Sequence, residues 1–191
     1  MKLLAAFLVI CVANISFLTI VSAAPPPIDQ KLKQILKNAV ASSNSFEDKF
    51  DAQVWLLDMS TRLRSIIKND QERLQVLKFV HLEAHQANLS PELVLAVIHV
   101  ESYFDRFAIS RSGARGLMQI MPFWLKEIGR SDDNLFHIQT NLRFGCTILR
   151  YYLDMEKGNL TRALARYNGS LGKTIYPNKV FKTRKKNWYK L

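Results

Sequence analysis

The chain has 191 residues, a length that suits one domain with a substantial hydrophobic core and argues against two full-sized domains. It carries 27 Lys and Arg against 16 Asp and Glu, a formal net charge of +11, which favours an anionic partner such as a cell wall, a membrane surface or nucleic acid. Nucleic acid is the weakest of these candidates, because the sequence has no basic-aromatic RNA-binding signature and no zinc-finger spacing.

The first 23 residues predict a secretory signal peptide. Lys2 precedes an apolar run over residues 3–21, and small residues up to Ala23 provide a cleavage site. The run approaches the length of a membrane span, so a retained anchor is the alternative, although polar residues inside it weaken that interpretation. We therefore expect an exported protein of the periplasm or cell envelope, with secretion as the alternative.

The two cysteines predict no internal disulfide. Cys11 lies inside the apolar run and would be removed with it, which leaves Cys146 alone in the mature chain. Cys146 stands in an apolar segment, so we expect a small core residue rather than a nucleophile.

Residues 24–70 are expected to form an extension with supporting helices. Three prolines at 25–27 predict an extended spacer behind the cleavage site. Two apolar stripes then recur at helical spacing, the first over residues 32–39 and the second starting at Phe50, Val54 and Leu57. We expect these helices to pack on the domain that follows, and docking to a partner is the alternative.

A further helix is predicted over residues 70–88, and it contains His81 and His85 at a spacing that suits metal ligands. A zinc protease needs a glutamate directly after the first histidine, whereas here Glu83 comes two residues later and no third ligand is suggested. We therefore expect no metal site and no cofactor.

The segment 90–122 contains the most informative residue of the chain, Glu101. Ser90 is a typical helix N-cap and Pro91 suits a first helical position, so a helix should begin here. Leu93, Val97 and Glu101 then recur four apart, which places the carboxyl on the apolar stripe. Burial and the negative end of the helix would both raise its pKa, as a proton donor for glycosidic cleavage requires. A solvated glutamate at the helix end is the alternative.

Helices are also predicted over residues 123–128, 141–153 and 160–167. The last segment, residues 179–191, is a basic tail in which lysines and arginines alternate with aromatic residues. Solvated charge is the simplest interpretation of this tail, and contact with an anionic wall or membrane surface is the alternative.

Three blocks of sequence occur in a characteristic order: Glu101-Ser102, then Gly116-Leu117-Met118-Gln119 with Met121-Pro122, then Ala165-Arg166-Tyr167-Asn168-Gly169. Together they resemble the signature blocks of the soluble-lytic-transglycosylase (SLT) domain family, which is similar in fold to goose-type lysozyme and cleaves peptidoglycan. The resemblance covers roughly residues 77–176. It implies a mainly α fold of the α+β lysozyme-like kind, with a single helical domain over 71–178 and a deep glycan cleft. The chain departs from the family at His137-Ile138, where relatives have an Asp-Pro step.

The resemblance also implies a reaction and a set of roles. Relatives cleave the MurNAc–GlcNAc β-1,4 bond with one glutamate as acid and then base, and leave 1,6-anhydromuramoyl ends. Glu101 would be that glutamate, and Tyr167 could hold its orientation. The expected substrate-binding residues, matched position by position, are Ser102, Met118, Gln119, Tyr167 and Asn168. Asp105 is the nearest candidate for a second carboxylate, and we expect it to be structural.

Two other functions fit the same residues. One is a goose-type hydrolase of the same bond, in which water replaces the internal hydroxyl. The other is a non-catalytic wall-binding component of a secretion assembly. The expected partners are peptidoglycan strands, an anionic surface through the basic tail, and secretion or pilus machinery, with no nucleic acid.

Overall fold

The computed structural model describes residues 49–189, and the predicted signal peptide, proline spacer and first helical stripe lie outside this part of the chain. The described part is helical, as predicted, and its β-structure is limited to isolated bridges of Arg115 with Ile109 and Ile120. Its helices are α2 (Lys49–Leu63), α3 (Asp70–Gln86), α4 (Pro91–Glu101), α5 (Trp124–Ile128), α6 (Ile138–Met155), α7 (Leu160–Tyr167) and α8 (Ile175–Asn187).

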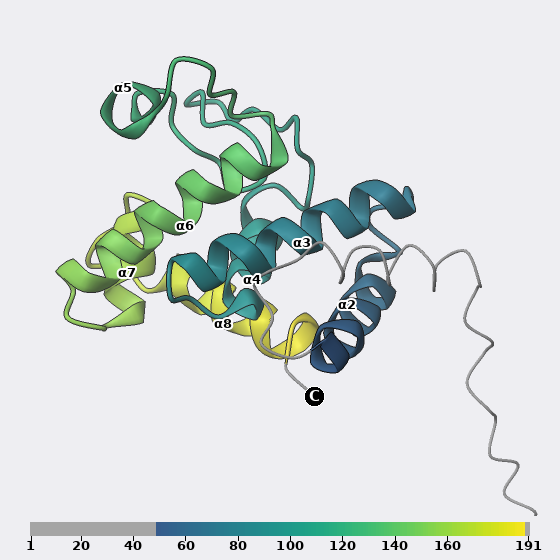
Figure 1. Ribbon diagram of the computed structural model, residues 1–191. Coiled ribbons are helices and arrows are strands. Elements are labelled where there is room, and N and C mark those ends of the chain that lie inside the picture. The colour runs from purple at the N-terminus through teal and green to yellow at the C-terminus, as the bar shows by residue number, and fades with distance from the viewer. Residues whose placement is uncertain (1–48, 190–191) are drawn as a thin grey trace, which may run out of the picture.

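Helix α4 is the central element of the fold (Figure 1). The hydroxyl of Ser90 accepts a hydrogen bond from the backbone N–H of Leu93, and Pro91 occupies the first turn, so the helix begins as predicted. Every residue from Glu92 to Ile98 is buried, because α3 and α8 pack on it from different sides. The sequence predicted one apolar stripe, and the helix is instead surrounded by protein.

Helix α6 forms the second layer of the body, between α3 and α7. Leu142, Cys146 and Leu149 of its apolar stripe are buried, whereas Leu153, the fourth residue of that stripe, is only partly buried. Cys146 is 1% exposed, which confirms the predicted core position, and burial raises the pKa of its thiol far above the ordinary value. The helix begins at Ile138, three residues before the predicted start.

Helix α2 packs on α3, which agrees with the expected supporting role of this segment. Its predicted stripe is partly wrong, since Val54 is 47% exposed and the buried face is formed by Ala52, Leu56, Met59 and Leu63. The two apolar faces differ by a small helix rotation, which spacing alone does not determine.

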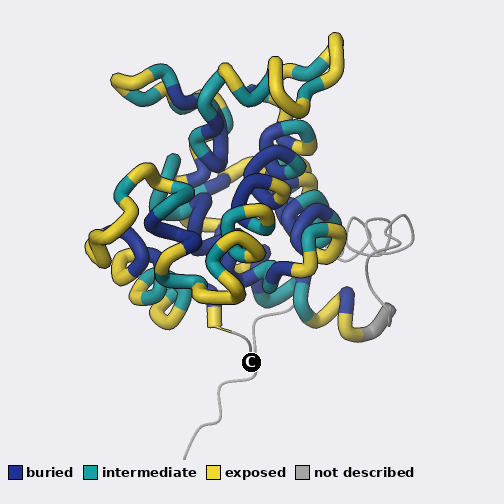
Figure 2. The backbone as a smooth tube through the Cα atoms, turned by 90° about the vertical axis from the view of Figure 1, so that its left-hand side faces the viewer, coloured by how far each residue is buried: buried dark blue, intermediate teal, exposed yellow. Residues whose placement is uncertain are grey.

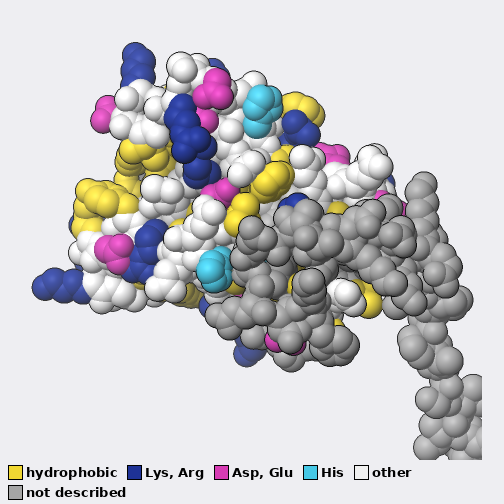
Figure 3. Space-filling view, viewed as in Figure 1, with side chains coloured by type: hydrophobic (Ala, Val, Ile, Leu, Met, Phe, Trp, Pro, Cys, Tyr) yellow, Lys and Arg dark blue, Asp and Glu magenta, His cyan; other side chains and the backbone are white. Residues whose placement is uncertain are grey.

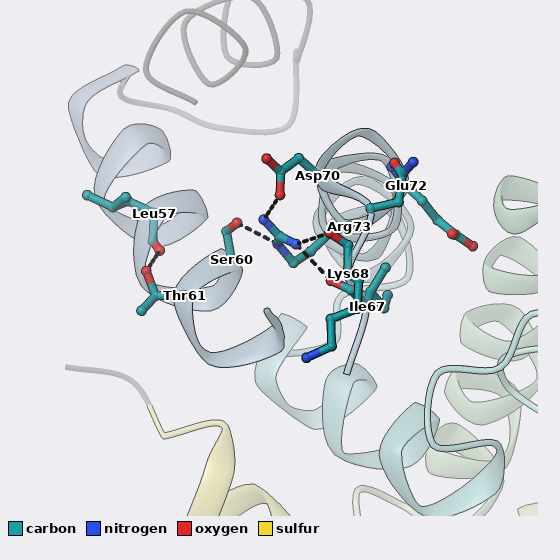
Figure 4. Close-up of polar contacts among 9 residues, drawn as sticks. Leu57, Ser60, Thr61, Ile67, Lys68, Asp70, Glu72 and Arg73 are labelled. Atoms are coloured by element: carbon teal, nitrogen blue, oxygen red, sulfur yellow. Dashed lines mark hydrogen bonds and ion pairs between the residues drawn. The ribbon is translucent and has the colours of Figure 1, made fainter. Parts of the chain in front are cut away.

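A buried arginine joins α2 to α3 (Figure 4). Arg73 is 1% exposed and donates to the hydroxyl of Ser60 at 3.0 Å and to the carbonyl of Ile67 at 2.7 Å. Its guanidinium also pairs with Asp70 at the start of α3. Since a buried charge is tolerated only when it is paired and hydrogen-bonded, this network fixes the α2–α3 connection.

Residues 102–137 form a loop-rich part above the helical body, with α5 at its edge (Figure 1). Figure 2 shows that buried residues gather in the helical body, while the outer parts of this upper segment are mostly intermediate or exposed. Asp105, Ile109 and Phe123 are among its exposed residues. The segment therefore depends on hydrogen bonds and a few buried anchors more than on a core of its own.

The predicted basic tail is an integral helix. Helix α8 begins at Ile175, so a domain boundary at 178 would fall inside it, and its residues Val180 and Trp188 are buried in the core. It packs against both α4 and α7. None of the described helices is long and apolar enough to cross a membrane.

Candidate active site

Glu101 is the last residue of α4, and the chain after it turns away from the helix axis. Tyr103 and Phe104 have φ values of 52° and 66°, in the left-handed region that non-glycine residues rarely adopt. Phe104 is buried and meets Trp188 edge-on, with ring centroids 5.4 Å apart. This packing holds the strained turn in place and fixes the end of α4 that carries the carboxyl.

The carboxyl of Glu101 is held by a tyrosine from α8. The hydroxyl of Tyr176 donates a hydrogen bond to Oε1 of Glu101 at 2.6 Å. Burial raises the pKa of Glu101 above its ordinary range, while the Tyr176 hydrogen bond and the nearby charge of Lys179 partly lower it. The net direction is upward, which confirms the prediction made from the apolar stripe.

Ser102 connects the end of α4 to the loop that carries the second sequence block. Its hydroxyl donates to the carbonyl of Leu117 at 2.7 Å, and its backbone N–H donates to Ile98 at 3.0 Å. Ser102 therefore neighbours the acid, as expected, and positions the loop beside it.

The loop depends on a close approach at Gly116. Gly116 has a φ of 74°, and an added Cβ would lie 2.5 Å from the carbonyl oxygen of Leu135 and 2.4 Å from the Asn141 side chain. Asn141 is buried and bonds to three backbone groups: it accepts from Met118 N–H at 2.7 Å and donates to Arg115 and Leu135 carbonyls at 2.9 and 2.8 Å. One amide thus shapes the loop.

Met118 lies inside the protein rather than in the wall of an open cleft. Its side chain is fully buried against α6, where a Cβ added at Gly145 would lie 2.2 Å from its sulfur. Its carbonyl oxygen accepts a hydrogen bond from the Tyr167 hydroxyl at 2.8 Å. The expectation that Met118 contacts substrate therefore needs correction, because the side chain is sequestered by its packing on α6 and supports the loop.

Gln119 is placed differently from its neighbour. It has a φ of 52° and is partly exposed, and its amide nitrogen donates to the carbonyls of Gly116 at 2.9 Å and Ala108 at 3.3 Å. Because both neighbours are acceptors, the amide orientation is determined and the carbonyl oxygen Oε1 faces away from them. That oxygen is a suitable acceptor for a hydroxyl or amide of a bound molecule.

Tyr167 and Asn168 lie at the end of α7. Burial raises the pKa of Tyr167 well above its ordinary value, and the charge of Glu101 adds to this effect. The hydroxyl that reaches Glu101 nevertheless belongs to Tyr176, since the Tyr167 hydroxyl is engaged by Met118. Asn168 is exposed at the C-terminal cap of the helix.

Asp105 does not share a helix face with Glu101, because α4 ends before it. Its carboxylate accepts a hydrogen bond from the backbone N–H of Phe107 at 2.9 Å, which is a turn-stabilising contact. This agrees with the expectation that Asp105 is structural.

The histidine pair of α3 is not part of a metal cluster in the described chain. Within residues 49–189, no group of three or more His, Cys, Asp or Glu side chains lies close enough to hold a metal ion. Burial lowers the pKa of His81 to about 4, and the neighbouring His85 adds to the shift. His81 meets Trp55 edge-on, with ring centroids 5.1 Å apart, so it is a packed histidine of the α2–α3 contact.

Residues 79–190 match the Transglycosylase SLT domain family, a region that holds Glu101, the Gln119 loop, Tyr167 and Tyr176. The chain belongs to this family. The match extends through α8, so the basic tail is part of the SLT domain as well as part of the fold.

Several SLT relatives are named as transglycosylases. The chain is 34% identical over 116 residues to the transglycosylase of Enterobacteria phage PRD1, covering 57% of this chain and 43% of the phage protein. It is 37% identical over 87 residues to the membrane-bound lytic murein transglycosylase F of Desulfosudis oleivorans. This match covers 42% of this chain and 19% of the Desulfosudis protein. The chain thus spans less than half of the length of these relatives.

Two solved lytic transglycosylases align with the chain at lower sequence identity. The Slt enzyme of Pseudomonas aeruginosa aligns with 85% of this chain and 36% of its own, at a TM-score of 0.47 and 20% identity. The 70 kDa soluble lytic transglycosylase of Escherichia coli aligns with 85% of this chain over 32% of its own length, at a TM-score of 0.47 and 17% identity.

Two residues of the site were missed by sequence reasoning. The sequence patterns identify Tyr176 only as the end of the resemblance and Asn141 only as the first residue of a predicted helix. Both act on residues far away in the sequence, so no local pattern identifies them. The one available signal was that an asparagine inside a helix with a continuous apolar stripe needs a hydrogen-bonding reason.

Proposed function

We propose that this chain is a peptidoglycan lytic transglycosylase that cleaves the MurNAc–GlcNAc β-1,4 bond. Protonated Glu101 donates its proton to the glycosidic oxygen as that bond breaks, and the leaving sugar takes the proton. The resulting carboxylate accepts the proton of the muramyl C6 hydroxyl as that oxygen attacks the anomeric carbon. The product is a 1,6-anhydromuramoyl end, Glu101 is reprotonated, and no water is consumed.

The observation that carries this proposal is the environment of Glu101. Its carboxyl is largely shielded from solvent, and burial raises its pKa above the ordinary range, which favours the protonated form that a general acid needs. Besides burial, Tyr176 and Lys179 act on this pKa, and neither of them is a carboxylate. A glycoside hydrolase of the usual kind needs a second carboxylate as nucleophile or base. Transglycosylation, which needs only one glutamate as acid and base, therefore fits the surroundings of Glu101 better.

The substrate contacts follow from exposure and free hydrogen-bonding capacity. We assign Gln119 Oε1 and the Asn168 amide to sugar hydroxyl or acetamido groups, since both are reachable from solvent. Ser102 and Tyr167 position the loop before Gln119, because their hydroxyls donate to the carbonyls of Leu117 and Met118.

We propose the cell envelope as the place where the chain acts. Membrane-bound relatives favour action in the cell envelope, which agrees with the predicted signal peptide. The domain would then be exported, with residues 24–70 as a supporting extension. A role beside a secretion or pilus assembly stays a prediction.

The decisive experiment is mass spectrometry of fragments released from purified peptidoglycan by the full chain. We expect anhydro ends from the wild type and no release by a folded Glu101→Gln variant. Reducing ends would show that water attacks and that the chain is a hydrolase of the goose-lysozyme type. Binding of glycan without any release by the wild type would show a non-catalytic wall-binding component instead.

A further inference from the structure

A pocket of about 320 Å³ lies where the C-terminal ends of α2, α4 and α8 meet. Figure 1 shows the end of α8 reaching α2 at this corner of the molecule. Its lining includes His99 and Tyr103, which lie two positions before and two positions after Glu101 in the sequence, while Glu101 is not among the lining residues. The lining residues used below are Arg62, His99, Tyr103, Lys186, Trp188 and Tyr189.

The lining of the pocket is cationic. None of the described residues that line it is acidic, and two of them are Arg62 and Lys186. Arg62 is already engaged: it pairs with Asp58 at 2.7 Å and stacks on the ring of Tyr189 at 4.0 Å from its centroid. Lys186 is exposed and makes no ion pair with the residues that the structure describes, so its charge is available to a ligand.

Lys186 is the last of three lysines on one face of α8. Lys179, Lys182 and Lys186 are spaced three and four apart, so they lie above one another along the helix over a distance of about 10 Å. All three are exposed, and α8 contains no acidic residue that could compensate them. Lys179 is close enough to Glu101 for its charge to act on that carboxyl. The stripe thus runs from the candidate acid toward the pocket.

This arrangement differs from the charge distribution elsewhere. Several arginines of the described chain are compensated by carboxylates, as Arg143 is by Asp133 at 2.6 Å. On the face shown in Figure 3, basic and acidic side chains are interspersed over the part that is not grey. The uncompensated charge of α8 is therefore a local feature and not a property of the whole surface.

The walls of the pocket suit a ligand that accepts hydrogen bonds and has some apolar surface. Tyr103 is 60% exposed and Tyr189 is 50% exposed. His99 and Trp188 meet edge-on, with centroids 5.8 Å apart, and each has a buried ring nitrogen without a hydrogen-bond partner among the described residues. The indole nitrogen of Trp188 can only donate, so the group that would satisfy it is an acceptor.

We propose that this pocket binds a carboxylate of the peptide substituent of the glycan strand, with Lys186 as the pairing cation and Lys179 and Lys182 guiding the substituent past Glu101. The inference rests on the proposed peptidoglycan activity, because that substrate carries peptide carboxylates close to the bond that is cut. A neutral sugar would gain nothing from three lysines that make no ion pair with the described residues, and the pocket is too small for a folded partner. The enzyme would then prefer strands that retain their peptides.

The test compares two adjacent lysines of the same helix. The full chain carrying Glu101→Gln, which prevents cleavage, is combined with Lys186→Glu or with the control Lys185→Glu. Lys185 is exposed as well but does not line this pocket. Binding of soluble glycan strands is measured for strands with their peptides and for strands whose peptides an amidase has removed. Lys186→Glu reverses the charge of an exposed side chain and should weaken binding of the peptide-bearing strands about tenfold.

The outcomes separate the proposal from general electrostatics. We expect Lys185→Glu to change binding less than about threefold, and both variants to bind peptide-free strands like their parent. Equal losses in the two variants, or an equal loss on peptide-free strands, would overturn the proposal. A soluble peptide with a free carboxylate should compete for the pocket better than inorganic phosphate at equal ionic strength, and equal competition would reduce the pocket to a general anion site.

Failure of this proposal and failure of the proposed function are distinguishable. Release of fragments by the wild-type chain is measured separately from binding. A chain that releases nothing but still discriminates the two kinds of strand through Lys186 would contradict the transglycosylase function and leave the pocket assignment intact.

Discussion

The hydroxyl of Tyr176 and the carboxyl of Glu101 are joined by a hydrogen bond of 2.6 Å, although the residues are 75 positions apart in the sequence. Glu101 ends α4 and Tyr176 lies in the first turn of α8, so the contact exists because α8 packs along α4. The helix that looks like a basic tail in the sequence therefore holds the candidate acid. Its next turn carries Lys179, whose charge acts on the same carboxyl.

Replacement of Tyr176 by Phe should raise the pKa of Glu101 further. The hydroxyl of Tyr176 stabilises the charged carboxylate, and phenylalanine lacks this donor. Activity that needs protonated Glu101 should then persist to higher pH, and the alkaline limb of the pH–rate profile should move upward. The rate at the optimum should fall about tenfold, because the carboxyl is less well oriented. The profile is measured as peptidoglycan release by a full-chain variant.

A matched control is Tyr151→Phe, since Tyr151 is an exposed tyrosine of α6. This variant should retain the wild-type profile. An unchanged alkaline limb in Tyr176→Phe would show that the hydrogen bond does not tune the acid.

The Glu101→Gln variant should be more stable than the wild type at neutral pH. The folded pKa of Glu101 is raised above its ordinary value of 4.5, so the folded state binds the proton more tightly than the unfolded state does. This contribution is complete below pH 4.5 and is lost as the pH rises through the folded pKa. Glutamine stays neutral and can still accept from Tyr176, so the two proteins should be equally stable at acidic pH and diverge above it.

Urea unfolding at several pH values measures this difference. The exposed α5 residue Glu127 provides a control, because Glu127→Gln should give no such divergence. Equal stabilities of Glu101→Gln and wild type at all pH values would mean that the buried carboxyl carries no stability cost.

The parts of the site that the sequence predicted are those with local causes. The helix of Glu101 was predicted because Ser90 and Pro91 are start signals and the apolar spacing that follows is readable within three turns. The direction of the pKa shift of Glu101 followed from the same stripe. These features depend on residues within about a dozen positions of one another, which is the range over which helical patterns carry information.

The parts that it did not predict depend on contacts between distant segments. The partner of Glu101 was expected to be Tyr167, a member of the third block, and is Tyr176 because of how α8 packs. Met118 was expected in the cleft, and its burial is visible only when Gly145 of α6 is seen to leave space for it. The rotation of α2, which exposes Val54, is likewise decided by α3.

The contact between Gly145 and Met118 gives a further prediction. In Gly145→Ala the new Cβ would lie 2.2 Å from the sulfur of Met118, so the methionine and the adjoining Gln119 must shift. Overpacking of this kind costs about 1–3 kcal/mol, and the displaced Gln119 should raise the KM for glycan. Chemical unfolding and kinetics of the variant measure the two effects.

The double variant Gly145→Ala, Met118→Ala tests the cause. It removes the sulfur that the new methyl group meets, so its loss of stability should be smaller than the sum of the two single losses by at least about 0.5 kcal/mol. Strict additivity would show that the two positions do not meet.

Removal of Arg73 should destabilise the fold without changing the chemistry. In Arg73→Met the apolar part of the side chain is kept, but the hydroxyl of Ser60 and the carbonyl of Ile67 lose their buried donor. Because these buried groups are left unsatisfied, the substitution should lower the free energy of unfolding by about 2–4 kcal/mol, which urea unfolding measures.

Arg73→Lys should lose nearly as much stability, because one ammonium cannot reproduce the planar guanidinium that joins Ser60, Ile67 and Asp70. The exposed Arg64→Met is the control and should lie within about 0.5 kcal/mol of wild type. The rate per folded molecule should be unchanged in all of these variants, and a selective loss of rate in Arg73→Met would mean that the α2–α3 connection contributes to the positioning of Glu101.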